Sequence, residues 1–283
     1  MLEELTGKPV LGVVPVMHVD IDDEDSVSGM PGTGTEDKPV DIAVIRLPRI
    51  SNFTDFSPLE NHPMLGVRYV RNVEKLGKPD MVIIPGTKST VADLLWMRQN
   101  GLEAAILKLH EAGVPVLGVC GGYQILGMKI FDPEHVEGEL DSVRGMELLP
   151  TETLFNAQKT RTRVNAEVVA DTFKGAKLDA YEIHNGVTTV HGEPFAFVGG
   201  DHYDGCVNGN ACGTYLHGLF DTGELTEKLA EMLCKKKGID MAEHEKVDHL
   251  EYLEKQYDML ADGIRASMDI DRIYEIMDRY SGE

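Results

Sequence analysis

The stretch VLGVCGGYQILG, residues 116–127, constrains the fold of this chain more than any other segment. It joins a short apolar run rich in valine (114–119), which predicts a buried strand, to a run whose apolar residues have helical spacing (122–130). Cys120 stands at the junction. A strand, a sharp turn and a helix are therefore expected here, with the cysteine at the turn.

Glycines flank this cysteine on both sides, as Gly118, Gly121 and Gly122. The pattern G-x-C-G-G is close to the G-x-S-x-G nucleophile elbow. A tight strand-to-helix turn crowds its neighbours, so residues without a Cβ are expected there, and the helix N-terminus favours a thiolate. A buried structural cysteine is the alternative, but core packing does not require glycines on both sides. We therefore expect Cys120 to be a nucleophile.

Strands and helices alternate around this turn. DIAVIRL (41–47), PDMVIIPG (79–86) and VPVLGVC (114–120) predict strands, and a capping box at Thr90 predicts a helix to about residue 112. This order predicts an α/β fold with a mostly parallel central sheet flanked by helices.

The rest of the chain differs in character. Short β-like runs between 150 and 220 predict added hairpins, and three helical segments follow at 224–237, about 248–261 and 269–280. At the start, residues 5–16 predict one apolar strand, and 29–39 has the Gly and Pro content of a linker.

A single strand cannot form a domain. We therefore expect residues 1–38 to be the tail of a domain whose body is missing here, followed by a linker, and 39–283 to be one domain with a C-terminal helical extension.

Charge and cysteine content limit the function. The chain has 27 Lys and Arg against 48 Asp and Glu, a net charge of −21 that opposes nucleic acid or an anionic membrane as a partner. It has four cysteines and no CxxC pair, with no signal peptide and no apolar run long enough to span a bilayer. A cytoplasmic location with reduced thiols is expected.

A cysteine nucleophile requires a base. His217 in GTYLHGLFD and His184 in YEIHNG both end strand-like runs, and either is a candidate beside a purely local structural role. The turn PGTKST leaves a strand expected beside the cysteine strand. Backbone N–H groups of Gly86 and Gly121 are therefore candidates for an oxyanion hole.

Some of these residues could instead belong to a phosphate-binding P-loop or to a zinc site. A P-loop requires G-x-x-x-x-G-K-[ST], and the residues before Gly86 are VIIP, which excludes it. The set His202, Cys206, Cys212 and His217 has ligand types that suit zinc, but its spacing matches no common zinc pattern. We expect no metal.

Four motifs in this order, PGTKST, VLGVCGGYQILG, YEIHNG and GTYLHGLF, resemble the class I glutamine amidotransferase domain of the cobyric acid and cobyrinate diamide synthase family. The resemblance covers about residues 40 to 221. Within the family, the segment RLPRISNFTDFSPLE (46–60) is most similar to the cobyric acid branch. The segment after residue 8 resembles the end of that family's ATP-dependent synthetase domain. The implied fold is flavodoxin-like, with added β-hairpins and C-terminal helices.

The resemblance implies a glutaminase. Cys120 would attack the carboxamide of glutamine, His217 would be the base, and Gly86, Gly121 and Gln124 would hold the oxyanion and the substrate. Hydrolysis of the glutamyl thioester needs no cofactor. The released ammonia would reach a synthetase domain, fused or separate, that uses ATP and Mg to amidate corrinoid side-chain carboxylates in cobalamin biosynthesis.

The sequence departs from the wider class I amidotransferase pattern at the residue that orients the base. Most relatives carry His-x-Glu, whereas His217 begins HGL, as in the cobyric acid branch. Glu182, Asp221 or a carboxylate of the missing synthetase are candidates, and a poorly oriented base predicts weak glutaminase activity in isolation.

Three assignments remain open at this point. His184 and Glu182 are accessory candidates without a defined step, and the loop with Asn52 and Asp55 is expected to face the partner domain. The chain could instead serve another acceptor (cobyrinate a,c-diamide synthase-like or lipid II-amidating), or be an inactive regulatory subunit. A Cys-His peptidase is disfavoured, because it has no reason to carry a synthetase's last strand.

Overall fold

A computed structural model describes residues 1–19, 21, 38–241 and 249–280. The chain divides into two compact units, a central unit (Glu24–His249) and a terminal unit formed by Met1–Asp23 with Leu250–Glu283. Nearly all of the predicted linker lies outside the described residues. The assignment of 1–38 to a synthetase tail stays a prediction.

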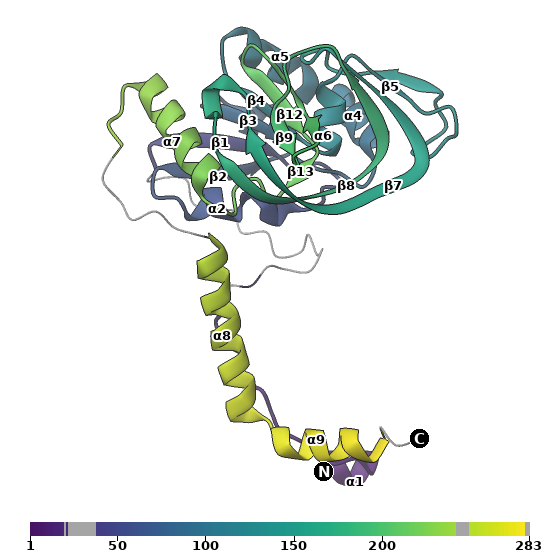
Figure 1. Cartoon of the computed structure of the whole chain (residues 1–283), viewed down its shortest axis with the longest axis vertical. Helices are drawn as coiled ribbons and strands as arrows, with labels where there is room; N and C mark the ends of the chain where they lie inside the picture. Colours follow the sequence, from purple (N-terminus) through teal and green to yellow (C-terminus); the bar gives the residue numbers. More distant parts are fainter. Residues whose placement is uncertain (20, 22–37, 242–248, 281–283) are drawn as a thin grey trace. The chain divides into compact units, whose positions relative to one another are not determined.

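A six-stranded sheet forms the centre of the central unit, in the order β11-β12-β4-β3-β1-β2 (Figure 1). Every neighbouring pair is parallel except β11 with β12. The strands are β1 (Val40–Ile45), β2 (Leu65–Val70), β3 (Met81–Ile84), β4 (Val116–Val119), β11 (Cys206–Asn208) and β12 (Ala211–Thr214). The predicted parallel sheet is confirmed, although β2 was missed because Arg68 and Tyr69 interrupt its apolar pattern.

Two apolar cores cover the faces of this sheet. One contains α4 (Thr90–Gln99), α5 (Leu102–Glu111) and α6 (Gly121–Leu126), and the other contains α2 (Ser57–Asn61) and α7 (Glu224–Lys237). Figure 1 places α5 and α7 on opposite sides of the sheet.

The helix predicted from Thr90 to about residue 112 is instead two helices. The break falls at Gly101, whose φ of 80° is unfavourable for other residues. By contrast, α7 has the predicted bounds and ends at Gly238 in the left-handed conformation (φ 68°).

A second sheet carries the predicted hairpins. Its strands are β5 (Lys129–Phe131), β6 (Ser142–Arg144), β7 (Thr151–Val168), β8 (Lys177–Val190), β9 (Ala196–Val198), β10 (His202–Asp204) and β13 (Leu216–His217). Outside this sheet, the central unit also has the short 3-10 turns η2 (Phe53–Phe56) and η3 (Asp171–Phe173), and the helix α3 (Val73–Leu76) after β2. β7 and β8 form the long curved antiparallel pair of Figure 1. β8 also pairs with β13, which places Tyr181 opposite His217.

The terminal unit contains α1 (Leu2–Thr6), α8 (His249–Ser267) and α9 (Ile270–Tyr280). The two C-terminal helices were predicted, whereas the predicted strand at 5–16 is wrong in part. Its first residues belong to α1, and only Gly12 forms a bridge, to Met268. Within the described part of the chain, no helix is both long and apolar enough to cross a membrane.

Candidate active site

Cys120 follows the last residue of β4 directly and precedes α6. Its backbone has φ 52° and ψ −108°, a conformation that is strained for a residue with a Cβ. Its N–H donates to Thr214 O (2.8 Å) and its carbonyl accepts from Gln124 N (3.1 Å), which holds the turn in place. The predicted sharp turn at the cysteine is therefore present and strained.

The neighbouring glycines allow this turn to pack. A Cβ at Gly118 would lie 2.6 Å from Gly122 O, and one at Gly122 would lie 1.9 Å from Ile84 O. A Cβ at Gly121 would lie 2.7 Å from the Thr87 side chain. Since real Cβ contacts are longer, the expectation that this turn requires glycines on both sides is confirmed.

His217 and Asp55 form a buried pair. Asp55 Oδ2 lies 2.6 Å from His217 Nδ1, while its Oδ1 accepts from Gly218 N at 3.1 Å. His217 is fully buried and Asp55 is 6% exposed. The expectation that Asp55 faces a partner domain is therefore wrong, because its carboxylate is directed at the histidine of its own chain.

The charge state of His217 follows from these neighbours. Burial lowers its pKa, but the Asp55 carboxylate and hydrogen bonding to Asp55 and Cys120 outweigh burial and raise the pKa of His217 to about 10. Its Nε2 is buried and has no hydrogen-bond partner of ordinary geometry among the described residues. Because Nδ1 is paired with Asp55, Nε2 is the ring nitrogen that remains for the Cys120 thiol.

The two carboxylates considered earlier for orienting His217 lie elsewhere. Glu182 is buried and interacts electrostatically with His202 and Asp204. Asp221 lies beside Gly218, to whose carbonyl its N–H donates (3.2 Å). The carboxylate at Nδ1 is that of Asp55, so the reason for expecting a poorly oriented base no longer holds.

The YEIHNG segment of β8 forms one wall of the site. Ile183 O accepts from Cys120 Sγ (3.5 Å), and the Tyr181 ring stacks on His217 with centroids 5.2 Å apart. His184 stacks on Tyr215 (3.7 Å between centroids), and burial lowers the pKa of His184 to about 4. His184 therefore stays neutral at pH 7, and of the two candidate bases His217 is the one paired with a carboxylate.

A cavity of about 450 Å³ opens at Cys120. Its lining is mostly polar and comprises Ser51, Asn52, Thr87, Lys88, Thr90, Cys120, Gly121, Gln124, Glu137, Phe155, Ile183, His184 and Asn185. The Gln124 amide donates to Asn185 O (3.0 Å) and Tyr215 OH (3.1 Å), and its oxygen accepts from Thr90 Oγ1 (3.0 Å). Gln124 thus joins two lining residues, Thr90 and Asn185, to the buried Tyr215.

The two turns predicted to form the oxyanion hole lie close together, and of their two glycines Gly121 lines the cavity. A Cβ at Gly86 would lie 3.3 Å from His217 Cε1, and one at Gly121 would lie 3.2 Å from Thr87 N. Ser51 N donates to Gly86 O and Lys88 N donates to Arg49 O, both at 2.9 Å. The turn after β3 is therefore fixed against the loop after β1, close to the cysteine.

The cavity lining includes one carboxylate and one ammonium group. Glu137 Oε2 accepts from Thr90 N at 2.6 Å. Burial raises the pKa of Glu137, although hydrogen bonds from the Thr90 and Val91 N–H groups act to lower it. Lys88 is the ammonium group. Sequence reasoning missed Glu137, because the loop DPEHVEG carries no motif that we connected with a site.

Metal ligands do not gather here or elsewhere in the described residues, where no group of three or more His, Cys, Asp or Glu could hold an ion. His217, one of the four residues considered above as zinc ligands, is instead paired with Asp55.

Comparison with known proteins places this geometry in a family. Residues 41–225 match the model of the CobB/CobQ-like glutamine amidotransferase domain. The chain is 43% identical to proteins named cobyric acid synthase from Ruminiclostridium cellulolyticum (98% of this chain, 57% of the relative) and Streptococcus sanguinis (99% and 57%). It thus spans just over half the length of these relatives.

A solved structure supports the fold independently. The structure titled PurLQS from Thermotoga maritima is similar with a TM-score of 0.51 and 20% identity, over 71% of this chain and 99% of that chain. This likeness concerns the fold alone. Together with the family match over most of the chain, it leads to one conclusion: the chain belongs to the family of CobB/CobQ-like glutamine amidotransferase domains.

Proposed function

We propose that this chain is the glutamine-hydrolysing portion of a cobyric acid synthase, with Cys120 as nucleophile and His217 as base. The observation that carries the proposal is the strained Cys120 turn beside the buried His217–Asp55 pair, at the mouth of a polar cavity. The identity to cobyric acid synthases favours this acceptor over the cobyrinate a,c-diamide and lipid II alternatives.

Hydrolysis begins with the Cys120 proton already held on His217 Nε2, while Asp55 accepts from Nδ1 and stabilises the imidazolium. The thiolate attacks the carboxamide carbon of glutamine. The N–H groups of Gly86 and Gly121 stabilise the oxygen that becomes negative. Imidazolium then gives its proton to the nitrogen, the C–N bond breaks, and ammonia leaves a glutamyl thioester on Cys120.

Water completes the cycle. His217 removes a proton from water as it attacks the thioester, and the C–S bond breaks to release glutamate and restore the Cys120 thiol. Tyr181, stacked on His217, and Ile183, whose carbonyl contacts Sγ, hold the two reacting side chains in this arrangement.

The other end of glutamine carries one ammonium and one carboxylate. We assign Glu137 to the ammonium and Lys88 to the carboxylate, since these are the charged side chains of the cavity lining. Gln124 would hold the wall through Asn185 and Tyr215 rather than act on the reacting bond. The site then selects a zwitterionic amino acid over a simple amide.

The released ammonia would be consumed by a synthetase portion that is not part of the described structure. An ATP- and Mg-dependent synthetase portion would activate corrinoid carboxylates for amidation in cobalamin biosynthesis. A cytoplasmic location and the lack of a metal in this chain stay predictions.

The proposal is tested by supplying that portion. The chain is mixed with the part of the R. cellulolyticum enzyme outside the match, together with glutamine, ATP, Mg and cobyrinic acid a,c-diamide. We expect corrinoid amide formation that stops with Cys120→Ser but continues when ammonium salts replace glutamine. Amide formation that is unchanged by Cys120→Ser would refute the proposal.

A further inference from the structure

Asp204 is a buried carboxylate that the mechanism above does not use. It is the last residue of β10 and is 6% exposed. Its Oδ2 accepts from Thr214 Oγ1, and Tyr215 N donates to both of its oxygens, at 3.3 Å (Oδ1) and 3.2 Å (Oδ2). Burial of a charge is costly unless the charge is hydrogen-bonded. These two donors therefore stabilise the ionised form of Asp204.

The two donors lie where the chain leaves one sheet and enters the other. β12 ends at Thr214 in the central sheet, β13 begins at Leu216 in the second sheet, and Tyr215 lies between them. Thr214 Oγ1 donates to Asp204 and also accepts from Leu216 N at 3.1 Å. Asp204 and the Thr214 hydroxyl thus provide acceptors for the backbone N–H groups of this bend, which are costly to leave unpaired.

Both reacting side chains are attached to the bend. Cys120 N donates to Thr214 O at 2.8 Å, which ties the cysteine turn to the residue before the bend. His217 is the second residue after Tyr215. A change in the backbone angles of Tyr215 would therefore move His217 relative to Cys120, and small displacements of reacting groups lower the rate of a reaction strongly.

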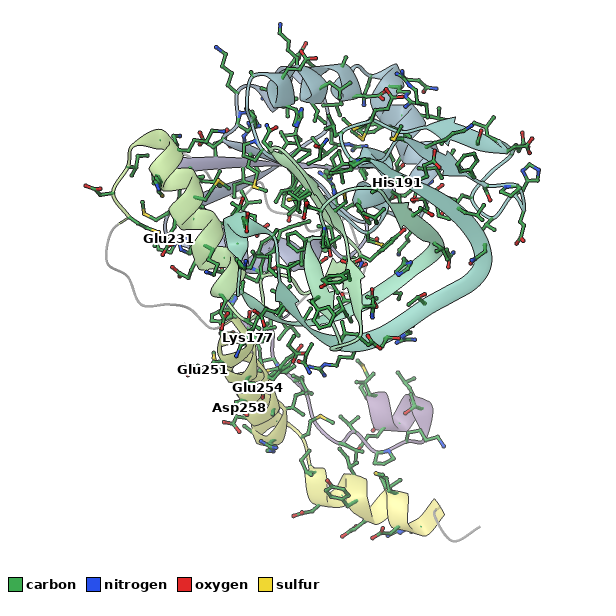
Figure 2. All side chains as sticks on the ribbon, turned by 45° about the horizontal axis from the view of Figure 1, so that its top comes forward. Lys177, His191, Glu231, Glu251, Glu254 and Asp258 are labelled. Carbon is green, nitrogen blue, oxygen red and sulfur yellow. The ribbon has the colours of Figure 1, made fainter. Side chains whose placement is uncertain are left out.

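Other titratable groups interact with Asp204 from neighbouring elements. Glu182 does so from β8, the strand that begins at Lys177 and ends just before His191 (both labelled in Figure 2). Tyr123 does so from α6. The nearest charged neighbour of this kind is thus a second carboxylate, which opposes ionisation of the first.

These surroundings place the charge change of Asp204 in an accessible pH range. Burial and Glu182 raise the pKa of Asp204 to about 6, although hydrogen bonds from Thr214 and Tyr215 act to lower it. His202, on the same strand, interacts with Glu182. Asp204 is therefore ionised at pH 7 and becomes neutral under mildly acidic conditions.

We propose that Asp204 is a positioning residue of this site, whose carboxylate fixes the bend at Tyr215 and so holds His217 in register with Cys120. Hydrogen bonds to an ionised acceptor are roughly twice as strong as those between neutral groups. Protonation of Asp204 therefore loosens the bend and lowers the rate. This inference rests on the proposed function and adds a residue to the same site.

Substitutions at the bend separate the charge from the shape of the side chains. Asp204→Asn keeps the shape, and its amide oxygen can still accept from Tyr215 N, but it carries no charge and does not titrate. Thr214→Val removes the hydroxyl at a fully buried position, and Thr214→Ser keeps it. Asp201→Asn is the matched control, since the Asp201 side chain is 79% exposed close to the start of β10.

The test uses the full chain and follows two rates between about pH 5 and 9. The first is kcat for glutamate release at saturating glutamine, which excludes pH effects on glutamine binding. The second is alkylation of Cys120 by iodoacetamide, which reports the Cys120–His217 pair without glutamine. Thermal unfolding of each variant shows whether it is folded.

In the wild type we expect kcat to fall as the pH drops below about 6, the pKa of Asp204. Asp204→Asn should lower kcat at pH 7 by about tenfold or more, with KM changed by less than about twofold, and should lose this fall. Thr214→Val should move the fall to higher pH, because the hydroxyl lowers the pKa of Asp204.

Three further variants or assays complete the test. Glu182→Gln should move the fall to lower pH, because a like charge is removed, whereas Thr214→Ser and Asp201→Asn should follow the wild type. An Asp204→Asn profile of wild-type shape would overturn the inference. If Asp204→Asn does not fold, profiles of Thr214→Val and Glu182→Gln that do not move would overturn it.

Failure of the proposed function has a different signature. A wild-type chain that releases no glutamate, but whose Cys120 alkylation follows the pH pattern expected for these variants, would count against glutamine hydrolysis and support the role of Asp204. Absence of this pattern from both rates would overturn the role of Asp204.

Discussion

Asp55 Oδ2 lies 2.6 Å from His217 Nδ1, although 162 residues separate the two in the sequence. Asp55 lies in the η2 turn of the loop after β1, and His217 ends β13, so the central sheet and the β8–β13 pairing bring them together. The second Asp55 oxygen accepts from Gly218 N, which fixes the carboxylate itself. Asp55 is thus the carboxylate that contacts the Nδ1 side of the His217 ring.

Replacement of Asp55 by Asn is expected to lower kcat for glutamine hydrolysis by about 10²- to 10⁴-fold with a small change in KM, because the imidazolium loses its partner. Asp221→Asn is the matched control, since Asp221 is the neighbouring carboxylate that does not face Nδ1. Steady-state glutamate release measures both. Equal losses in the two variants would contradict the role of Asp55.

The turn glycines are expected to be intolerant of a single methyl group. Gly122→Ala places a Cβ within 1.9 Å of Ile84 O, so we predict a loss of about 1–3 kcal/mol or more in the free energy of unfolding. Gly138→Ala, where a Cβ would meet nothing within 4 Å, is the control. Urea denaturation compares them, and an unaffected Gly122→Ala protein would show that the turn relaxes.

Glu137→Gln is expected to raise KM for glutamine by roughly tenfold or more, with kcat nearly unchanged, because a charge-assisted hydrogen bond to a bound ammonium contributes about 1.5–3 kcal/mol. The amide oxygen can still accept from Thr90 N, so the fold is retained. Glu139→Gln is the matched control on the exposed part of the same loop. An unchanged KM would remove Glu137 from the substrate site.

The raised pKa of His217 makes stability depend on pH. Since its folded value of about 10 exceeds the ordinary 6.5, the native state holds this proton more tightly, and the stabilisation is complete below about pH 6.5 and lost as the pH rises toward 10.

The difference in the free energy of unfolding between wild type and His217→Gln should therefore shrink between pH 6.5 and 10, by up to about 1.4 kcal/mol per pH unit. His135→Gln, at an exposed histidine, is the matched control. A difference that grows with pH would contradict a protonated His217.

Local sequence patterns predicted much of this fold and site, because the strands β1, β3 and β4 are continuous apolar runs and the Cys120 turn has its glycines in a short motif. The residues that were missed depend on distant pairing. Asp55 reaches His217 only through the sheet topology, and Glu137 meets Thr90 across 47 residues. A pattern of neighbours cannot report either contact.

The break at Gly101 illustrates a different limit. Thr90 and the apolar spacing favour one helix, and a single glycine within it is tolerated in many helices. Here Gly101 takes a left-handed conformation (φ 80°) directly before the first residue of α5. The composition of the segment does not distinguish these two outcomes.

The central claim is that Cys120 is an activated thiol in a glutamine site, and covalent labelling by 6-diazo-5-oxo-norleucine tests it most directly. Burial raises the pKa of the Cys206 and Cys212 thiols to about 11 and 12, so these should stay unmodified. Intact mass and peptide mapping are predicted to show one adduct, on Cys120, that excess glutamine prevents. A folded chain, with its synthetase portion present, that forms no adduct or forms it on another cysteine would contradict the account.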